Sequence, residues 1–316
     1  MTNSQKIIDY LWNTLGDNLK LLFIPYKRDM WDGLEGVYKE ALNKGWTANV
    51  MPLPYCYRNR DFELGDWIMD DWGGIPTIEA KLPDKGEYDI ILFHNQYDQC
   101  NQVTSIKPDF YTNKFIGLSR ALCLVPYGIG STASIYPGIL NADFIFTEND
   151  DVVEAMLNDA RRLGMNDNQI NYFKQRFITT GSPKCDLDLN QTIPEDWQAK
   201  IKDKRVILFA TSLVPLLRDA MGELNKYDTL LDELTSGDNI VIWRAHPLTL
   251  GTIRAMIPDC EYLYSVIRRE FEAKDNTIID DTNDYRKAFS IADVLYSVPS
   301  SLIPVWELTG KELHIV

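Results

Sequence analysis

Three short polar stretches in the second half of the chain hold side chains suited to phosphate chemistry. Each lies at the end of an apolar run typical of a buried strand, or a few residues beyond it: Thr211-Ser212, Arg244-Ala-His246 and Ser300-Ser301. Carboxyl ends of parallel strands share one edge of a sheet, so we expect these stretches to lie together. A diphosphate ligand needs hydroxyl donors, a cation and, in a reaction, a proton source for the leaving group. The hydroxyl side chains supply the first, Arg244 the second and His246 the third.

The last of these stretches precedes an expected helix. Pro299 restricts the turn, and either Ser300 or Ser301 is a natural N-cap. Glu307, further along that helix, suits the hydroxyls of a ribose as well as it suits plain solvation, and both readings stay open. His246 has a structural alternative too, namely a buried imidazole bonded to a neighbouring carbonyl.

A second histidine ends an apolar run in the first half of the chain. The run Tyr88–His94 is followed by Asn95-Gln-Tyr-Asp98. We predict that His94 is a general base for an acceptor alcohol, oriented by Asp98, because histidine titrates near neutral pH. The alternative is that His94 holds the following turn by hydrogen bonds.

These side chains depend on an alternation of strands and helices along the whole chain. Apolar runs predict strands at 19–25, 46–53, 88–94, 121–126, 142–147, 176–180, 205–210, 239–244, 277–280, 292–296 and 313–316. Helical periodicity predicts helices at 4–15, 30–43, 149–163 and 168–175, among others. Alternating strands and helices indicate an α/β protein with parallel sheets.

A polar break divides the two series of strands. Residues 184–204 lack strand character, so we place a linker there, between domains 1–190 and 191–316. The predicted fold is two doubly wound, Rossmann-like domains facing across a cleft, with the acceptor side in the first and the donor side in the second. An irregular stretch as long as 54–87 is usually functional or mobile, and a lid on the acceptor side is one reading of it, with its role left open.

Composition excludes several classes of function. The formal net charge is −14, from 46 acidic and 32 basic residues, which argues against broad contact with nucleic acid or anionic lipid. The five cysteines lack paired spacing, so we expect reduced thiols, no metal site and no cofactor. No apolar run reaches membrane-spanning length. These features predict a cytoplasmic protein with at most peripheral association at the inner face of the membrane.

Four stretches in order carry a resemblance to a known family. They are Gly181-Ser-Pro-Lys-Cys-Asp186, Ile207–Asp219, Trp243-Arg-Ala-His-Pro247 and Asp281–Val316. Together they resemble the CDP-glycerol glycerophosphotransferases, the teichoic acid primases and polymerases, over roughly residues 120–316. The resemblance implies a GT-B fold. It also implies transfer of a glycerophosphate, polyol-phosphate or sugar group from a nucleotide-activated donor to a polyol, glycan or glycolipid acceptor during cell-surface polymer synthesis.

The chain departs from that family at two positions. Tyr127 stands where the family carries its proposed catalytic histidine, and Val298 stands where it carries an acid before the paired serines. Tyr127 is therefore assigned to the acceptor side without a role as base. Two alternatives to a transferase stay open: a nucleotide-binding or assembly protein that has lost catalysis, and an epimerase of a nucleotide-sugar.

Overall fold

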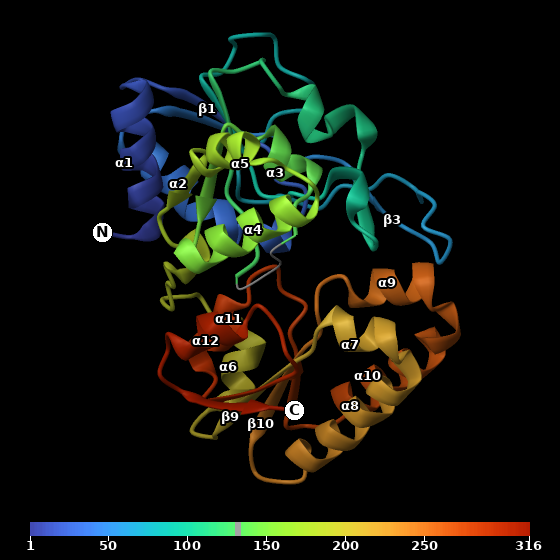
Figure 1. Cartoon of the computed structure of the whole chain (residues 1–316). Helices are drawn as coiled ribbons and strands as arrows, with labels where there is room; N and C mark the ends of the chain where they lie inside the picture. The colour runs from blue at the N-terminus through green and yellow to red at the C-terminus, as the bar shows by residue number, and fades with distance from the viewer. Residues whose placement is uncertain (130–133) are drawn as a thin grey trace. The chain divides into compact units, whose positions relative to one another are not determined.

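The computed structural model describes residues 1–129 and 134–316, and these form two compact units (Figure 1). The first unit comprises residues 1–57 and 64–186; the second comprises 58–63 and 187–316. The division therefore falls at Asp186/Leu187 rather than at 190/191, and the segment 58–63 groups with the second unit although the sequence placed it in the first.

The first unit is built on a parallel sheet. Its strand order is β2-β1-β4-β6-β7-β8, and every neighbouring pair is parallel. The strands are β1 (Lys20–Phe23), β2 (Thr47–Val50), β4 (Ile90–Phe93), β6 (Ala121–Leu124), β7 (Phe144–Thr147) and β8 (Phe177–Thr179). Because β2 and β4 lie on opposite sides of β1, the switch point of this sheet falls between β1 and β4, where open α/β sheets commonly bind ligands.

Helices cover this sheet through periodic apolar faces. The helices are α1 (Asn3–Leu15), α2 (Asp32–Asn43), α3 (Pro137–Asn141), α4 (Asp150–Arg162) and α5 (Asp167–Lys174). Leu11 of α1 and Leu34 of α2 join one core cluster with alternate strand residues such as Phe23 and Leu92. Because alternate residues of each strand pack under the helices, the strands are held in place, and the polar residues that follow them lie along one edge of the sheet.

An antiparallel pair, β3 (Tyr55–Tyr57) with β5 (Thr104–Ile106), adds a second small sheet to the first unit. The sequence predicted neither strand, because each is a short segment with no apolar run around it. The stretch 54–87 is thus anchored in part: Tyr55 also bonds to Ile68 through backbone groups in both directions. Its role as a lid stays a prediction.

The second unit repeats the parallel design with another strand order. Its sheet runs β11-β10-β9-β12-β13, all parallel. The strands are β9 (Val206–Ala210), β10 (Ile240–Arg244), β11 (Thr277–Ile279), β12 (Val294–Ser297) and β13 (Glu312–Ile315). In chain order this is the Rossmann arrangement 3-2-1-4-5, with its switch point between β9 and β12.

The helices of the second unit lie on both faces of its sheet (Figure 1). They are α6 (Glu195–Ile201), α7 (Leu213–Arg218), α8 (Ala220–Thr235), α9 (Thr249–Met256), α10 (Glu261–Glu272), α11 (Arg286–Ile291) and α12 (Ile303–Glu307). Residues of α7, α8, α9 and α10 pack with Phe209 and Trp243 in one core cluster. The helix α6 corrects the predicted linker 184–204: its Trp197 is buried, so this polar stretch carries a packed helix.

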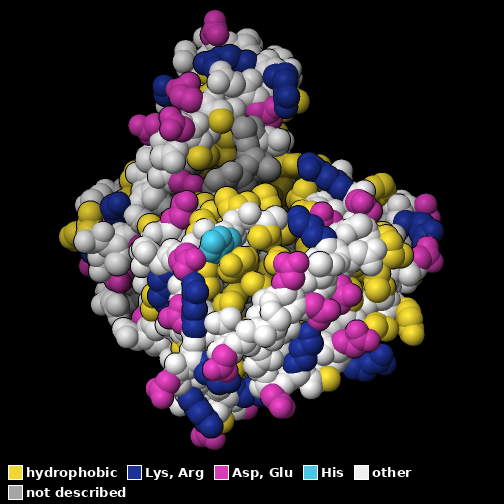
Figure 2. Space-filling model, turned by 90° about the horizontal axis from the view of Figure 1, so that it is seen from below, with side chains coloured by type: hydrophobic (Ala, Val, Ile, Leu, Met, Phe, Trp, Pro, Cys, Tyr) yellow, Lys and Arg dark blue, Asp and Glu magenta, His cyan; other side chains and the backbone are white. Residues whose placement is uncertain are grey.

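The surface agrees with the acidic composition. On the face in Figure 2, basic and acidic side chains are intermixed, and no continuous basic area is visible there. Within the described residues, no helix has both the length and the apolar character needed to cross a bilayer.

Candidate functional site

The predicted polar stretches of the second unit do follow neighbouring strands on one sheet edge. Ala210, the last residue of β9, is in register with Arg244 of β10 on one side and Ser297 of β12 on the other. At the switch point, the Ser212 hydroxyl donates a hydrogen bond to the Pro299 carbonyl at 3.1 Å. This bond ties the loop after β9 to the loop after β12, so hydroxyl groups from both strands gather at this edge.

The serines of the β12 loop are partly exposed, whereas Thr211 and Ser212 are buried. The Ser300 hydroxyl lies 3.2 Å from that of Ser297 and accepts the Leu302 N–H at 3.3 Å. The predicted N-cap was wrong: the cap residue is Leu302, and α12 is a single short turn. Ser300 instead stabilises the turn before that helix.

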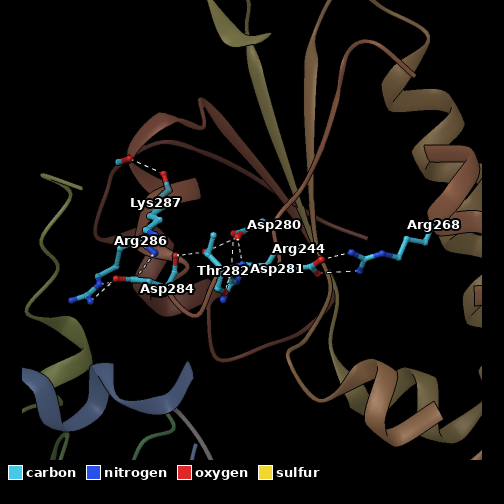
Figure 3. A network of polar contacts seen from close by, with 9 residues as sticks. Arg244, Arg268, Asp280, Asp281, Thr282, Asp284, Arg286 and Lys287 are labelled. Carbon is cyan, nitrogen blue, oxygen red and sulfur yellow. Dashed lines mark hydrogen bonds and ion pairs between the residues drawn. The ribbon is translucent and has the colours of Figure 1, made fainter. Parts of the chain in front are cut away.

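Arg244 does not have the free cationic side chain that the sequence predicted. Its Nη1 donates to the Asp280 carboxylate at 2.6 Å and to the Thr282 carbonyl at 3.0 Å (Figure 3). Arg244 is 5% exposed and Asp280 3%. Arg244 thus has a counter-ion inside the unit, and a contact between its guanidinium and a phosphate stays a prediction.

The same network organises the loop between β11 and α11. Asp280 accepts both the N–H and the hydroxyl of Thr282, whose hydroxyl also donates to the Asp284 carbonyl. Asp284 in turn binds Arg286 through Nε and Nη2, and this lowers its pKa against the opposing effect of burial. This network was not predicted from the sequence, although the acidic residues from Asp280 to Asp284 are its visible signal.

His246 is partly buried, in the loop that follows β10. Its Nδ1 accepts the backbone N–H of Leu248 at 3.1 Å. A neutral imidazole whose Nδ1 is an acceptor carries its proton on Nε2. His246 therefore offers an N–H at Nε2 as a hydrogen-bond donor, and its predicted role as the proton source, which needs the doubly protonated ring, stays a prediction.

Glu307 is the final residue of α12 and is exposed. The sequence predicted a helix that begins at the paired serines, whereas α12 begins at Ile303 and ends at Glu307. Its exposure favours the reading that the carboxylate is simply solvated. The other reading, a contact with ribose hydroxyls, stays a prediction.

His94 is fully enclosed in the first unit, with both ring nitrogens engaged by backbone groups. Nε2 accepts the Tyr26 N–H at 3.3 Å, and Nδ1 lies 3.1 Å from the Met30 carbonyl, so the proton resides on Nδ1. Burial lowers the pKa of His94 to about 3. A ring whose accepting nitrogen is already occupied cannot take a proton from an alcohol. The prediction that His94 is a general base is contradicted, and the structural alternative fits.

The two acceptor-side residues also have intramolecular roles. Asp98 is buried, which raises its pKa, and its carboxylate accepts the N–H and the hydroxyl of Thr112 rather than orienting His94. The ring of Tyr127 packs 5.7 Å from that of His94. Burial raises the pKa of Tyr127 well above its usual range, so the phenol stays protonated.

The motif Gly181–Asp186 serves the first unit's own architecture. The Asp186 carboxylate accepts the N–H groups of Asn3 and Ser4 at the start of α1, each at 2.7 Å. Lys184 forms a buried ion pair with Asp32 of α2 at 3.1 Å. This stretch therefore binds both α1 and α2, and these contacts account for its acidic and basic residues without a bound ligand.

Comparison with known proteins gives likeness in structure only. No protein-family model matches the chain, and no curated protein matches its sequence. The UDP-GlcNAc 2-epimerase of Methanocaldococcus jannaschii, in complex with UDP-GlcNAc and UDP, has a TM-score of 0.58 at 8% identity, over 93% of this chain and 83% of its own. The UDP-GlcNAc 2-epimerase of Neisseria meningitidis, bound to UDP-GlcNAc, has a TM-score of 0.55 at 11% identity, over 94% and 82%.

A variant of the wall teichoic acid polymerase TagF is also similar, with a TM-score of 0.49 at 13% identity, over 99% of this chain and 76% of its own. That likeness is too weak to bear on function. The stronger likenesses, together with the two parallel sheets, confirm the predicted fold class: this is an α/β chain of GT-B type, built from two Rossmann-like units.

Proposed function

We propose that the second unit binds a nucleotide-activated compound and that the protein is a transferase of the group this compound carries. The observation that supports this most directly is the switch point between β9 and β12. There the Ser212–Pro299 bond brings the two loops together, and Thr211, Ser300 and Ser301 add hydroxyl groups. Ligands of doubly wound sheets commonly bind at the carboxyl ends of the strands at such a point.

The chemistry proposed for this edge uses few groups. Hydroxyls and the Nε2–H of His246 donate hydrogen bonds to the phosphate oxygens, and the nucleotide departs as an anion stabilised by them. Arg244 acts indirectly, since its contacts with Asp280 and Thr282 fix the neighbouring loop. The sequence resemblance favours a CDP-linked polyol as the donor.

An epimerase of a nucleotide-sugar is the second candidate. The solved structures with TM-scores of 0.58 and 0.55 are both UDP-GlcNAc 2-epimerases. The transferase hypothesis relied on His94 as the general base for the acceptor alcohol, so the burial of His94 weakens it. The epimerase hypothesis did not rely on His94. The two candidates share the nucleotide site and differ in whether a second substrate is needed.

A panel of ligands tests the proposal. Thermal unfolding is followed with CDP-glycerol, CDP-ribitol, CMP, UDP-GlcNAc and UDP, each over a range of concentrations. A bound ligand at about 100 times its Kd stabilises the fold by about 2.7 kcal/mol. Stabilisation by the cytidine compounds supports the transferase, and stabilisation by UDP and UDP-GlcNAc alone supports the epimerase. If no nucleotide in the panel raises the unfolding temperature, the proposal is wrong.

A further inference from the structure

The stretch 66–80 of the first unit places exposed apolar side chains next to acidic ones. Its large apolar side chains with 39% to 49% exposure are Trp67, Ile68, Met69 and Ile78. The stretch contains four acidic residues and no lysine or arginine. Single exposed apolar residues are ordinary, whereas several in one stretch mark an interaction surface. We call this stretch the acidic surface.

A hollow of about 330 Å³ opens within the acidic surface, a size typical of binding pockets. Met69 and Ile78 give it apolar walls, and its described lining holds no basic residue. The acidic lining residues are Asp70, Asp71 and Glu79. The hollow lies within the first unit alone, so it is complete without the second unit.

The three carboxylates of the hollow differ in their partners. Asp70 accepts the Tyr55 hydroxyl at 2.6 Å and lies 3.5 Å from the ammonium group of Lys27. Asp71 and Glu79 are exposed, and neither forms an ion pair within the described part of the chain. Two negative charges at the hollow therefore remain available to a cation from outside.

Two further basic residues lie close to the acidic surface in space or in sequence. The guanidinium of Arg28 lies 5.7 Å from the centre of the Trp72 ring. Lys81 directly follows the stretch and is exposed. Across the described residues, neither is paired with Asp71 or Glu79, so both carboxylates keep their charge toward solvent.

We infer that the acidic surface docks a segment of a partner protein in which basic and apolar residues alternate. A lysine or arginine of that segment enters the hollow beside the carboxylates of Asp71 and Glu79. Its apolar side chains cover Met69 and the neighbouring exposed residues. This docking site is separate from the proposed nucleotide edge and does not depend on the proposed function.

Charge complementarity selects this partner over the other occupants of an apolar surface. A second copy of the same surface would bring acidic residues against acidic residues, and an anionic membrane would be repelled in the same way. A small ammonium compound would fill the hollow alone and leave Trp67 and Ile68, which are outside its described lining, exposed. A basic and apolar peptide segment satisfies both the charges and the apolar side chains.

Three synthetic peptides test the inference on the intact protein. In the first, lysine and leucine alternate; in the second, glutamate replaces lysine; in the third, serine replaces leucine. Calorimetry gives the affinities, and NMR of the protein labelled with ¹³C at the methionine methyl groups gives the place of binding. Met69 reports on the hollow, and Met221, equally exposed at 49% but in the second unit, is the reference.

We expect the lysine–leucine peptide to shift the Met69 signal saturably while the Met221 signal stays in place. The other two peptides should bind at least about tenfold more weakly, because each lacks one half of the complementarity. Equal affinity for either of them, or a Met69 signal that never shifts, overturns the inference.

A double variant, Asp71→Asn with Glu79→Gln, tests the charges. We expect it to bind the lysine–leucine peptide about 2- to 30-fold more weakly, the effect of losing two exposed ion pairs. Its control is Asp203→Asn with Glu272→Gln, two exposed carboxylates of the second unit, which changes the net charge equally and should bind like the wild type. An equal loss in both double variants would mean that the overall charge attracts the peptide, and the docking site would be wrong.

Met69→Ser tests the apolar part of the acidic surface. Burial of the exposed half of the methionine side chain predicts about 4- to 12-fold weaker binding of the lysine–leucine peptide in this variant. Met221→Ser, with the same exposure in the second unit, should bind like the wild type. Urea denaturation shows that both variants fold. Wild-type affinity in a folded Met69→Ser variant would contradict the docking of an apolar side chain there.

Discussion

The guanidinium of Arg244 lies 2.6 Å from the Asp280 carboxylate, with both side chains shielded from water. The pair joins the ends of the neighbouring strands β10 and β11. The pair shows that a basic residue at the carboxyl edge of a sheet can stabilise the loops that follow the strands.

Asp280→Asn keeps the shape of the side chain and removes its charge, leaving Arg244 buried without a counter-ion. We expect the free energy of unfolding to fall by about 3–5 kcal/mol, the usual cost of breaking a buried pair. Urea denaturation measures it. Asp238→Asn, in an exposed pair with Lys204, is the control and should change nothing measurable. Equal stability of the wild type and Asp280→Asn would show that the pair is not structural.

The buried His94 predicts a specific dependence of stability on pH. Its pKa is lowered to about 3 in the folded protein, whereas an unfolded histidine titrates near pH 6.5. Between these values the unfolded chain binds a proton that the folded protein does not. The contribution is therefore fully favourable above about pH 6.5 and is lost as the pH falls toward 3.

His94→Asn cannot titrate but retains a donor for the Met30 carbonyl. We expect this variant to be less stable than the wild type at about pH 7, yet to lose less stability between about pH 7 and 5.5. Urea denaturation at both pH values gives the comparison. Parallel losses in the two proteins would mean that His94 does not stay neutral in the folded state.

The carboxylate of Asp186 holds the first turn of α1 through the N–H groups of Asn3 and Ser4. Asp186→Asn should lower the free energy of unfolding by about 1.5–3 kcal/mol and increase amide hydrogen exchange in α1 first. Nucleotide affinity should not change. Asp188→Asn, an exposed carboxylate nearby, is the control. If a folded Asp186→Asn variant bound the nucleotide more weakly, the motif Gly181–Asp186 would take part in ligand binding, contrary to its structural contacts.

His246 carries the proposed hydrogen-bond donor at Nε2, because Nδ1 accepts the Leu248 N–H. We expect His246→Ala to lower turnover about 100- to 1,000-fold, the effect of losing one hydrogen-bond donor to the charge of the transition state, and to leave the Kd for the nucleotide nearly constant. His314→Ala is the control, since His314 is exposed and bonded to Glu312. A His246→Ala enzyme with wild-type kcat would remove the residue from the mechanism.

The sequence was sufficient to locate the strands of both parallel sheets and the edge where the polar stretches meet. The reason is local: buried parallel strands are continuous apolar runs, and the residue after such a run lies at the sheet edge. The run Arg205–Ala210 became β9 on this basis, and Thr211 and Ser212 follow it as expected.

The partners of charged residues could not be predicted in the same way. Arg244 and Asp280 are 36 positions apart in the chain, and only the pairing of β10 with β11 makes them neighbours. Likewise, nothing around His94 indicates that Tyr26 and Met30, from the loop after β1, occupy both its nitrogens.

The central claim is that the carboxyl edge of the second unit's sheet binds the phosphates of a nucleotide. The most direct measurement is calorimetric titration of the wild type, Ser301→Asp and Ser236→Asp with CDP-glycerol and with UDP-GlcNAc. Ser301→Asp adds a negative charge at this edge, whereas Ser236 lies just before β10, at the opposite edge. We predict that one nucleotide binds the wild type and Ser236→Asp equally and binds Ser301→Asp at least about tenfold more weakly, the effect of about 1.4 kcal/mol of repulsion. Equal affinity in Ser301→Asp and the wild type, or no binding to the wild type at all, would contradict the account.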